Sequence, residues 1–123
     1  MATMQSRDTR TFVAGEDLSA AQFKFVTLEA GNVVDLADSA GENCVGVLLV
    51  EGAAARAVTV VMTGSVMVEA GGTVTAGGAV GIDAAGLAVD AASTDIIMGY
   101  ATEAGVTSQI IAIELIQGGN AAA

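Results

Sequence analysis

The chain has 123 residues, a formal net charge of −10 and 53% hydrophobic residues, and it contains no His, Trp or Pro. This length suits one domain with a hydrophobic core of its own. Nucleic-acid binding draws its affinity from Lys and Arg side chains that neutralise phosphates, and an anionic membrane surface repels acidic proteins. With only four Lys and Arg residues, the chain is expected to bind neither nucleic acid nor membranes.

The order of apolar and turn-forming residues predicts an all-β chain. Residues 1–14 have no sustained apolar period and are predicted to form an extended N-terminal arm. Residues 15–117 alternate short Val-, Ile- or Phe-rich runs with Gly or small polar residues, as in β-strands joined by tight turns, and residues 118–123 are expected to form a flexible tail. The predicted strands are 23–28, 32–37, 44–50, 57–62, 73–76, 79–83, 87–90, 96–101 and 109–116. The sequence therefore predicts a compact β-barrel or β-sandwich with Gly-rich turns.

Two short motifs recur along the chain. LEAG at 28–31 resembles VEAG at 68–71, and VGV at 45–47 resembles MGY at 98–100. This pattern indicates either two related β-halves packed together or a chance match within a chain rich in Ala, Gly and Val. The sequence leaves both interpretations open.

No motif in the sequence predicts catalysis. Residues 72–77 have the G-x-x-x-x-G spacing of a phosphate-binding loop, but Gly78 and Ala79 stand where that loop needs Lys and then Ser or Thr. Lys24 lies between two Phe residues and is expected to point outward from a strand, while Cys44 lies in an apolar run and is expected to be buried. Without His, neither a zinc site nor a catalytic triad is expected. We therefore predict no enzyme activity, no metal and no cofactor.

The arm carries the sequence features that favour binding to another protein. Half of the four cations lie in the first ten residues, on an otherwise acidic chain. A basic segment that can form a strand is able to add to an exposed sheet edge, where backbone hydrogen bonds supply affinity. A disordered N-terminus is the open alternative. The residues predicted to make this contact are Arg7, Arg10, Thr11, Phe12 and Val13.

Several motifs together resemble a known family. They are GEDLSAAQFKFV (15–26), CVGVL (44–48), VEAGGTVTAGGAV (68–80), DAAGLAV (83–89) and IMGYA (97–101). In this order they resemble the small capsid cement, or head decoration, proteins of tailed bacteriophages, over residues 12–116. The motifs consist of turn and core residues, so their order carries more weight than any one of them.

This resemblance implies a structural role. It implies a compact β-domain, made in the host cytoplasm, that assembles on the outer surface of a phage capsid and stabilises the expanded shell. The expected partners are the major capsid protein and further copies of the same chain, as homotrimers at three-fold and quasi-three-fold positions. It implies no catalytic residues. The alternative is a phage tail or baseplate subunit, or another non-catalytic β-domain that binds a partner.

Overall fold

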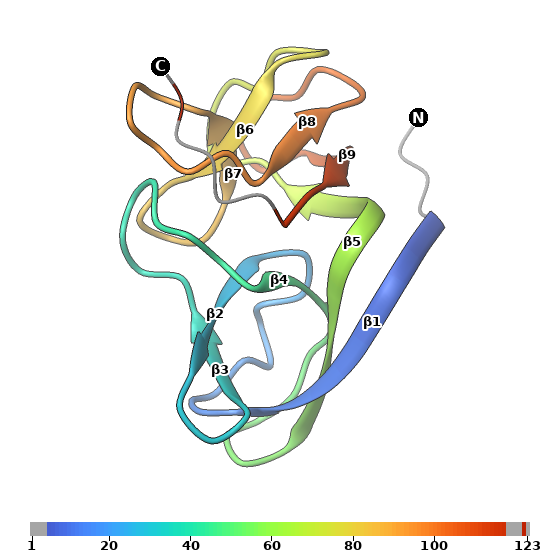
Figure 1. Ribbon diagram of the computed structural model, residues 1–123, viewed down its shortest axis with the longest axis vertical. Helices are drawn as coiled ribbons and strands as arrows, with labels where there is room; N and C mark the ends of the chain where they lie inside the picture. The colour runs from blue at the N-terminus through green and yellow to red at the C-terminus, as the bar shows by residue number, and fades with distance from the viewer. Residues whose placement is uncertain (1–4, 118–121, 123) are drawn as a thin grey trace.

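The computed structural model describes residues 5–117 and Ala122, with side chains from Asp8 onward. Within these residues the chain forms nine β-strands (Figure 1) and no helix, so no described helix is long enough to cross a membrane. The all-β prediction is confirmed. The strands are β1 (Gln5–Ala14), β2 (Phe25–Glu29), β3 (Val33–Leu36), β4 (Gly46–Val50), β5 (Ala57–Glu69), β6 (Ala79–Ile82), β7 (Ala88–Asp90), β8 (Gly99–Ala101) and β9 (Ile110–Leu115).

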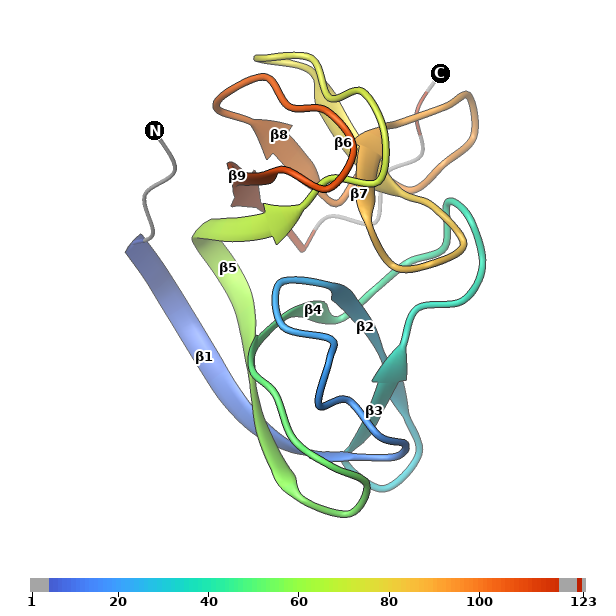
Figure 2. The same ribbon diagram turned by 180° about the vertical axis from the view of Figure 1, so that it is seen from behind.

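The first five strands form a closed barrel, which we call the first barrel. Their order is β1-β3-β2-β4-β5, and β5 pairs with β1 to close the circle. All neighbours are antiparallel except β1 and β3, which run parallel. This barrel is the lower lobe in Figures 1 and 2. Its interior contains Phe12, Ala14, Leu18, Ala21, Val26, Val34, Leu48, Val58 and Val60. Of the two predicted architectures, the barrel is therefore correct.

The prediction of a separate N-terminal arm is wrong for residues 5–14. These residues form β1, which pairs with β5 from Gln5 opposite Ser65 to Val13 opposite Ala57. Phe12 is only 6% exposed, because its side chain points into the first barrel. The chain's own β5 satisfies the backbone groups along one edge of this strand. The arm is instead the strand that closes the barrel.

Strand β5 continues into a second unit, the second barrel. Gly64 has φ +104°, a conformation that side chains rarely adopt, and β5 bends between the two lobes in Figure 1. Beyond Gly64, β5 pairs with β9, and the order continues β9-β8-β6-β7. A parallel bridge between Ala70 and Ala88 brings the end of β5 back to β7. In this unit β5 therefore takes the place that β1 takes in the first barrel.

The two barrels are copies of one backbone design. The order of hydrogen-bonded neighbours in the first barrel, starting at β3, is β3-β2-β4-β5-β1. It matches the order β7-β6-β8-β9-β5 in the second barrel, strand by strand. A Cβ on Gly46 would collide with the Val61 carbonyl oxygen, and a Cβ on Gly99 would collide with that of Glu114. Four backbone N–H···O=C bonds of the first barrel have counterparts in the second. In the first barrel they run from Phe23 to Leu48, Lys24 to Ala21, Val45 to Val26 and Arg56 to Ala53. Their counterparts, in the same order, run from Gly77 to Ala101, Gly78 to Thr75, Met98 to Val80 and Gln109 to Val106. The likeness of VGV to MGY is therefore a structural repeat.

The other repeated motif is not structural, because residues 28–31 enter the β2–β3 turn whereas residues 68–71 end β5.

The predicted tail lies largely outside the described residues, which resume only at Ala122. There the N–H of Ala122 donates to the Asp95 carbonyl at 2.8 Å, and the N–H of Thr94 donates to the Ala122 carbonyl at 2.9 Å. The prediction of an unattached tail is therefore wrong at Ala122.

Candidate interaction surfaces

The one cysteine has little chemical reactivity in this fold. Cys44 is buried beside the first barrel, and its Sγ lies 3.8 Å from the Glu42 carbonyl oxygen. Burial, with a smaller contribution from the Glu42 charge, raises the pKa of the Cys44 thiol to about 12. The thiolate is the nucleophilic form, so Cys44 is an unreactive core residue. Across the part of the chain that the structure describes, no three His, Cys, Asp or Glu side chains are grouped so that they could hold a metal ion.

The residues predicted to contact a capsid do not form one surface. Arg10 and Thr11 are exposed on β1, and Val13 is partly exposed, whereas Phe12 is buried. Arg7 lies in β1, and its side chain is outside the described ones. The structure thus brings three of the five side chains to the outside of the first barrel. Whether they contact a capsid stays a prediction.

Much of β1 has one edge with no neighbouring strand among the described residues. It pairs with β5 along its length, but with β3 only at Val13 and Ala14. In Figures 1 and 2 its N-terminal half runs along the outside of the molecule, with β5 on one side. Open strand edges present backbone N–H and C=O groups that can pair with another chain. The capacity for strand addition that the sequence suggested therefore survives as an edge of the first barrel.

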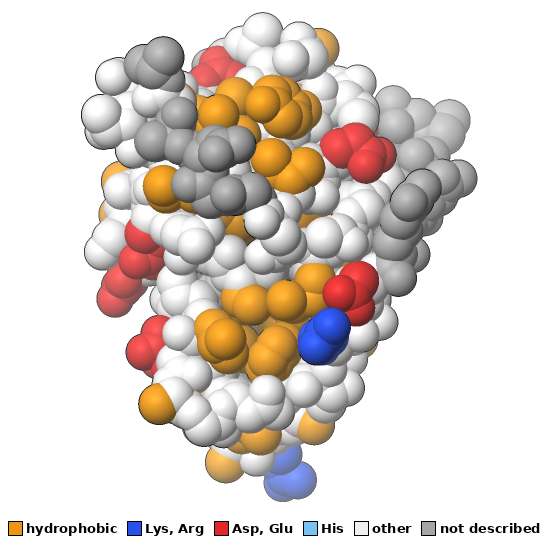
Figure 3. Space-filling view, in the orientation of Figure 1, with side chains coloured by type: hydrophobic (Ala, Val, Ile, Leu, Met, Phe, Trp, Pro, Cys, Tyr) orange, Lys and Arg blue, Asp and Glu red, His pale blue; other side chains and the backbone are white. Residues whose placement is uncertain are grey.

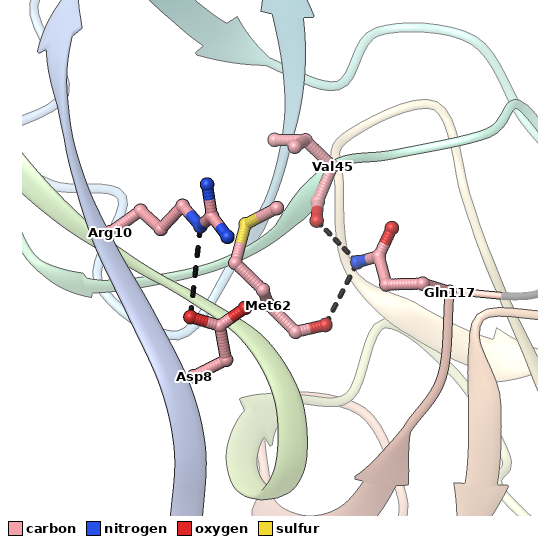
Figure 4. A network of polar contacts seen from close by, with 5 residues as sticks. All are labelled: Asp8, Arg10, Val45, Met62 and Gln117. Carbon is pink, nitrogen blue, oxygen red and sulfur yellow. Dashed lines mark hydrogen bonds and ion pairs between the residues drawn. The ribbon is translucent and has the colours of Figure 1, made fainter.

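A charged pair and an apolar patch lie beside this edge. Arg10 Nε is 3.6 Å from Asp8 Oδ1, and both side chains are largely exposed, so the pair contributes about 1 kcal/mol or less to stability. Figure 4 shows Met62 next to Arg10, and Figure 3 shows an apolar patch on each lobe of this face.

The Nε2 of Gln117 donates to the carbonyls of Val45 at 2.6 Å and Met62 at 2.8 Å. Gln117 thereby ties the segment after β9 to the first barrel.

An acidic groove of about 460 Å³ lies beside the β2–β3 hairpin. Asp35 lines it, and Asp35 Oδ1 is buried with no hydrogen-bond partner among the described residues. This concentration of negative charge disfavours phosphate groups at the groove. The carboxylates that line it belong to Glu16, Glu29, Asp35, Asp38 and Glu42.

Sequence reasoning missed a further set of exposed apolar side chains. They are distributed over both barrels instead of being concentrated on β1. Each lies next to residues that are buried or polar, so the local sequence around it gave no signal. The missed residues are Leu28, Val50, Tyr100, Val106 and Ile110, whereas Val13, which is also exposed, is among the residues that the sequence predicted.

The fold has a counterpart among solved structures. It is similar to the crystal structure of the head fiber gp8.5 N base in bacteriophage phi29, with a TM-score of 0.70 and 15% sequence identity. The similarity covers 89% of this chain and 93% of that chain. The likeness is one of fold. A scan against protein-family models and a search of curated proteins gave no match.

Proposed function

We propose that the chain is a structural protein of a tailed-bacteriophage head, and more specifically a decoration protein that binds the outer capsid surface. The observation that carries the proposal is the fold similarity over 89% of the chain to a protein described as part of a phage head fiber. The ordered motifs that resemble capsid cement proteins support the same assignment independently, because they are features of the amino-acid sequence alone.

The proposed mechanism is adhesion without catalysis. The open edge of β1, with Arg10, Thr11 and Val13 beside it, is the surface that we assign to the major capsid protein. A protein that binds the expanded shell and not its separated subunits stabilises the shell by mass action, since disassembly must first lose the bound copies. Three copies joined as a trimer at three-fold and quasi-three-fold positions would gain about 10²–10⁴-fold in avidity over one copy.

The net charge of −10 suits a place outside the shell, because an acidic protein there does not compete for the packaged genome. The proposal includes no nucleic acid, membrane, metal or cofactor as a partner.

The test is addition of purified protein to expanded heads that lack it, followed by electron microscopy and thermal disassembly. We expect new density at three-fold positions and a higher disassembly temperature. Binding to isolated tails and not to heads would instead assign the chain to the tail.

Charge reversal on β1 tests the capsid-binding surface. Replacing Arg7 and Arg10 by Glu should weaken binding to heads, most clearly at low salt, because exposed charges are screened as salt rises. Arg56→Glu is the control, since Arg56 is exposed at the turn between β4 and β5 and lies beside the C-terminal end of β1, where its carbonyl accepts from the N–H of Ala14, and not beside the open N-terminal half of β1. A loss from Arg56→Glu equal to the loss from Arg10→Glu alone, each of which changes the net charge by the same amount, would mean that overall charge, and not β1, governs binding.

A further inference from the structure

The first barrel has an outward-facing apolar row that the second barrel covers. Phe25, Val47 and Val61 lie side by side across β2, β4 and β5. Their chain neighbours Val26, Leu48 and Val60 fill the barrel, so this row faces outward, yet all three side chains are 0% exposed. They belong to the same apolar cluster as the interior of the second barrel. The row is therefore one half of the contact between the barrels.

The β6–β7 hairpin of the second barrel supplies the other half. The N–H of Phe25 donates to the Gly86 carbonyl at 2.9 Å, and the N–H of Gly41 donates to the Ile82 carbonyl at 3.0 Å. Gly86 lies against the carbonyls of Phe25 and Ala37. Ile82, at the end of β6, is 1% exposed and belongs to the apolar cluster that contains the row. A hairpin of one barrel thus packs on the outer row of the other.

The repeat places an equivalent row on the second barrel. Gly46 matches Gly99 in its close approach to a carbonyl, so Val47 corresponds to Tyr100. The equivalent row is Ala79, Tyr100 and Glu114, which again lie side by side across three strands. Here Tyr100 is 46% exposed and Glu114 is exposed.

The repeat also places an equivalent hairpin on the first barrel. The β2–β3 hairpin matches β6–β7, and Leu28 takes the place of Ile82, two residues after the matching interior positions Val26 and Val80. Leu28 is 53% exposed, although Ile82 is buried. Both halves of the internal contact therefore recur on the outside of the molecule, on different barrels.

We propose that these two surfaces bind each other between copies of the chain. The β2–β3 hairpin of one copy, led by Leu28, packs on the Ala79–Tyr100–Glu114 row of the next copy. The partner is a second copy because the chain already makes this contact once within itself, and only its own first barrel carries the matching hairpin. Tyr at the centre with a charge at the rim is the usual composition of such an interface.

This contact is head-to-tail, because two different surfaces meet. Repetition of a head-to-tail contact gives a ring when the rotation closes and a filament when it does not. The inference deepens the self-association in the proposed function, and it requires no capsid.

Two charge substitutions test the contact, one on each half. Leu28→Asp and Tyr100→Asp should each raise the dissociation constant of self-association by about 30-fold or more, as expected for loss of a central apolar or aromatic contact. Val50→Asp is the control, since Val50 is equally exposed (51%) at the opposite end of β4 from the hairpin. Sedimentation should show oligomers for the wild-type chain and the control, and monomers for the two variants. Leu28→Ser and Tyr100→Ala test the same two halves of the contact without adding a charge.

Mixing the two variants gives the sharpest outcome. Each retains the half that the other has lost, so a mixture should form a 1:1 heterodimer and nothing larger, which native mass spectrometry resolves by mass. A wild-type chain that stays monomeric, a single variant that keeps the wild-type size, or a mixture that stays monomeric would each overturn the proposal. Failure of the proposed function is separate, since a chain that assembles in this way but ignores phage heads would leave this contact intact.

Discussion

The substitution Phe12→Ala tests whether residues 5–14 close the first barrel as strand β1 or form an arm that is separate from it. Phe12 is 6% exposed and packs in the first barrel with Leu18 and Val58 in its apolar cluster. Replacement of a buried Phe by Ala costs about 3–5 kcal/mol, from lost transfer free energy and the cavity left behind. Domains of this size unfold with about 5–15 kcal/mol, so this one change should remove a large share of the total. By the usual entropy of unfolding, the melting temperature should fall by on the order of 10–20 °C.

The assay is urea unfolding followed by circular dichroism, together with calorimetry. Thr11→Ala is the matched control, because Thr11 directly precedes Phe12 on the same strand and its side chain is exposed. A surface substitution of this kind should change the free energy of unfolding by about 0.5 kcal/mol or less. If Phe12→Ala cost under about 1 kcal/mol, β1 would not be part of the core in solution, and the segment would be the separate arm after all.

Two further predictions concern the repeat and the buried thiol. Gly46→Ala and Gly99→Ala should each destabilise the protein by about 1–3 kcal/mol, because the new methyl group meets a carbonyl of the adjacent strand, whereas Gly72→Ala has room and should be near neutral in calorimetry. A result in which only one of the first two changes is harmful would contradict the equivalence of the barrels. Cys44 should resist thiol reagents at pH 8 until urea unfolds the chain. Because its pKa is raised to about 12 in the folded state, the unfolded thiol ionises first, so the wild-type chain should lose stability from about pH 9 to 12 relative to Cys44→Ala.

Most strand positions could be predicted because their signals are local. The runs at 57–62, 79–83 and 109–116 overlap β5, β6 and β9. In each, apolar residues with β-propensity end at turn-forming residues, and those properties need no knowledge of the partner strand.

The errors arose where a distant partner decides the structure. β1 begins with the polar run QSRDTR, which has little apolar pattern, and it becomes a strand because β5 pairs with it. The sequence predicts a strand that ends at residue 62, yet β5 continues through Gly64 to Glu69. Residues 73–76 look like a strand, but Val74 makes only a single bridge to Gly105, and Gly77 with φ +77° turns the chain. Local propensity is overridden by tertiary pairing in all three places.

The interaction surfaces were the least predictable part. The sequence pointed to the basic residues of β1, and it did not show that Phe12 faces the core while its neighbours face outward. Tyr100 had one usable signal, namely that MGY has a Tyr where VGV has Val. That signal becomes informative only when the repeat is known to be structural, because a large amphipathic side chain then stands where its counterpart is buried.

The differences between the two equivalent rows indicate when each contact forms. Phe25, Val47 and Val61 are apolar and are covered as the chain folds, so they never face water in the native state. Their counterparts, Ala79, Tyr100 and Glu114, must face water until another copy arrives, and an exposed row of Phe and Val would promote indiscriminate association. Tyr keeps a large contact area with a polar end, and Glu keeps the free chain soluble. The same backbone site thus carries a residue set suited to permanent burial in one barrel and a set suited to later, selective assembly in the other.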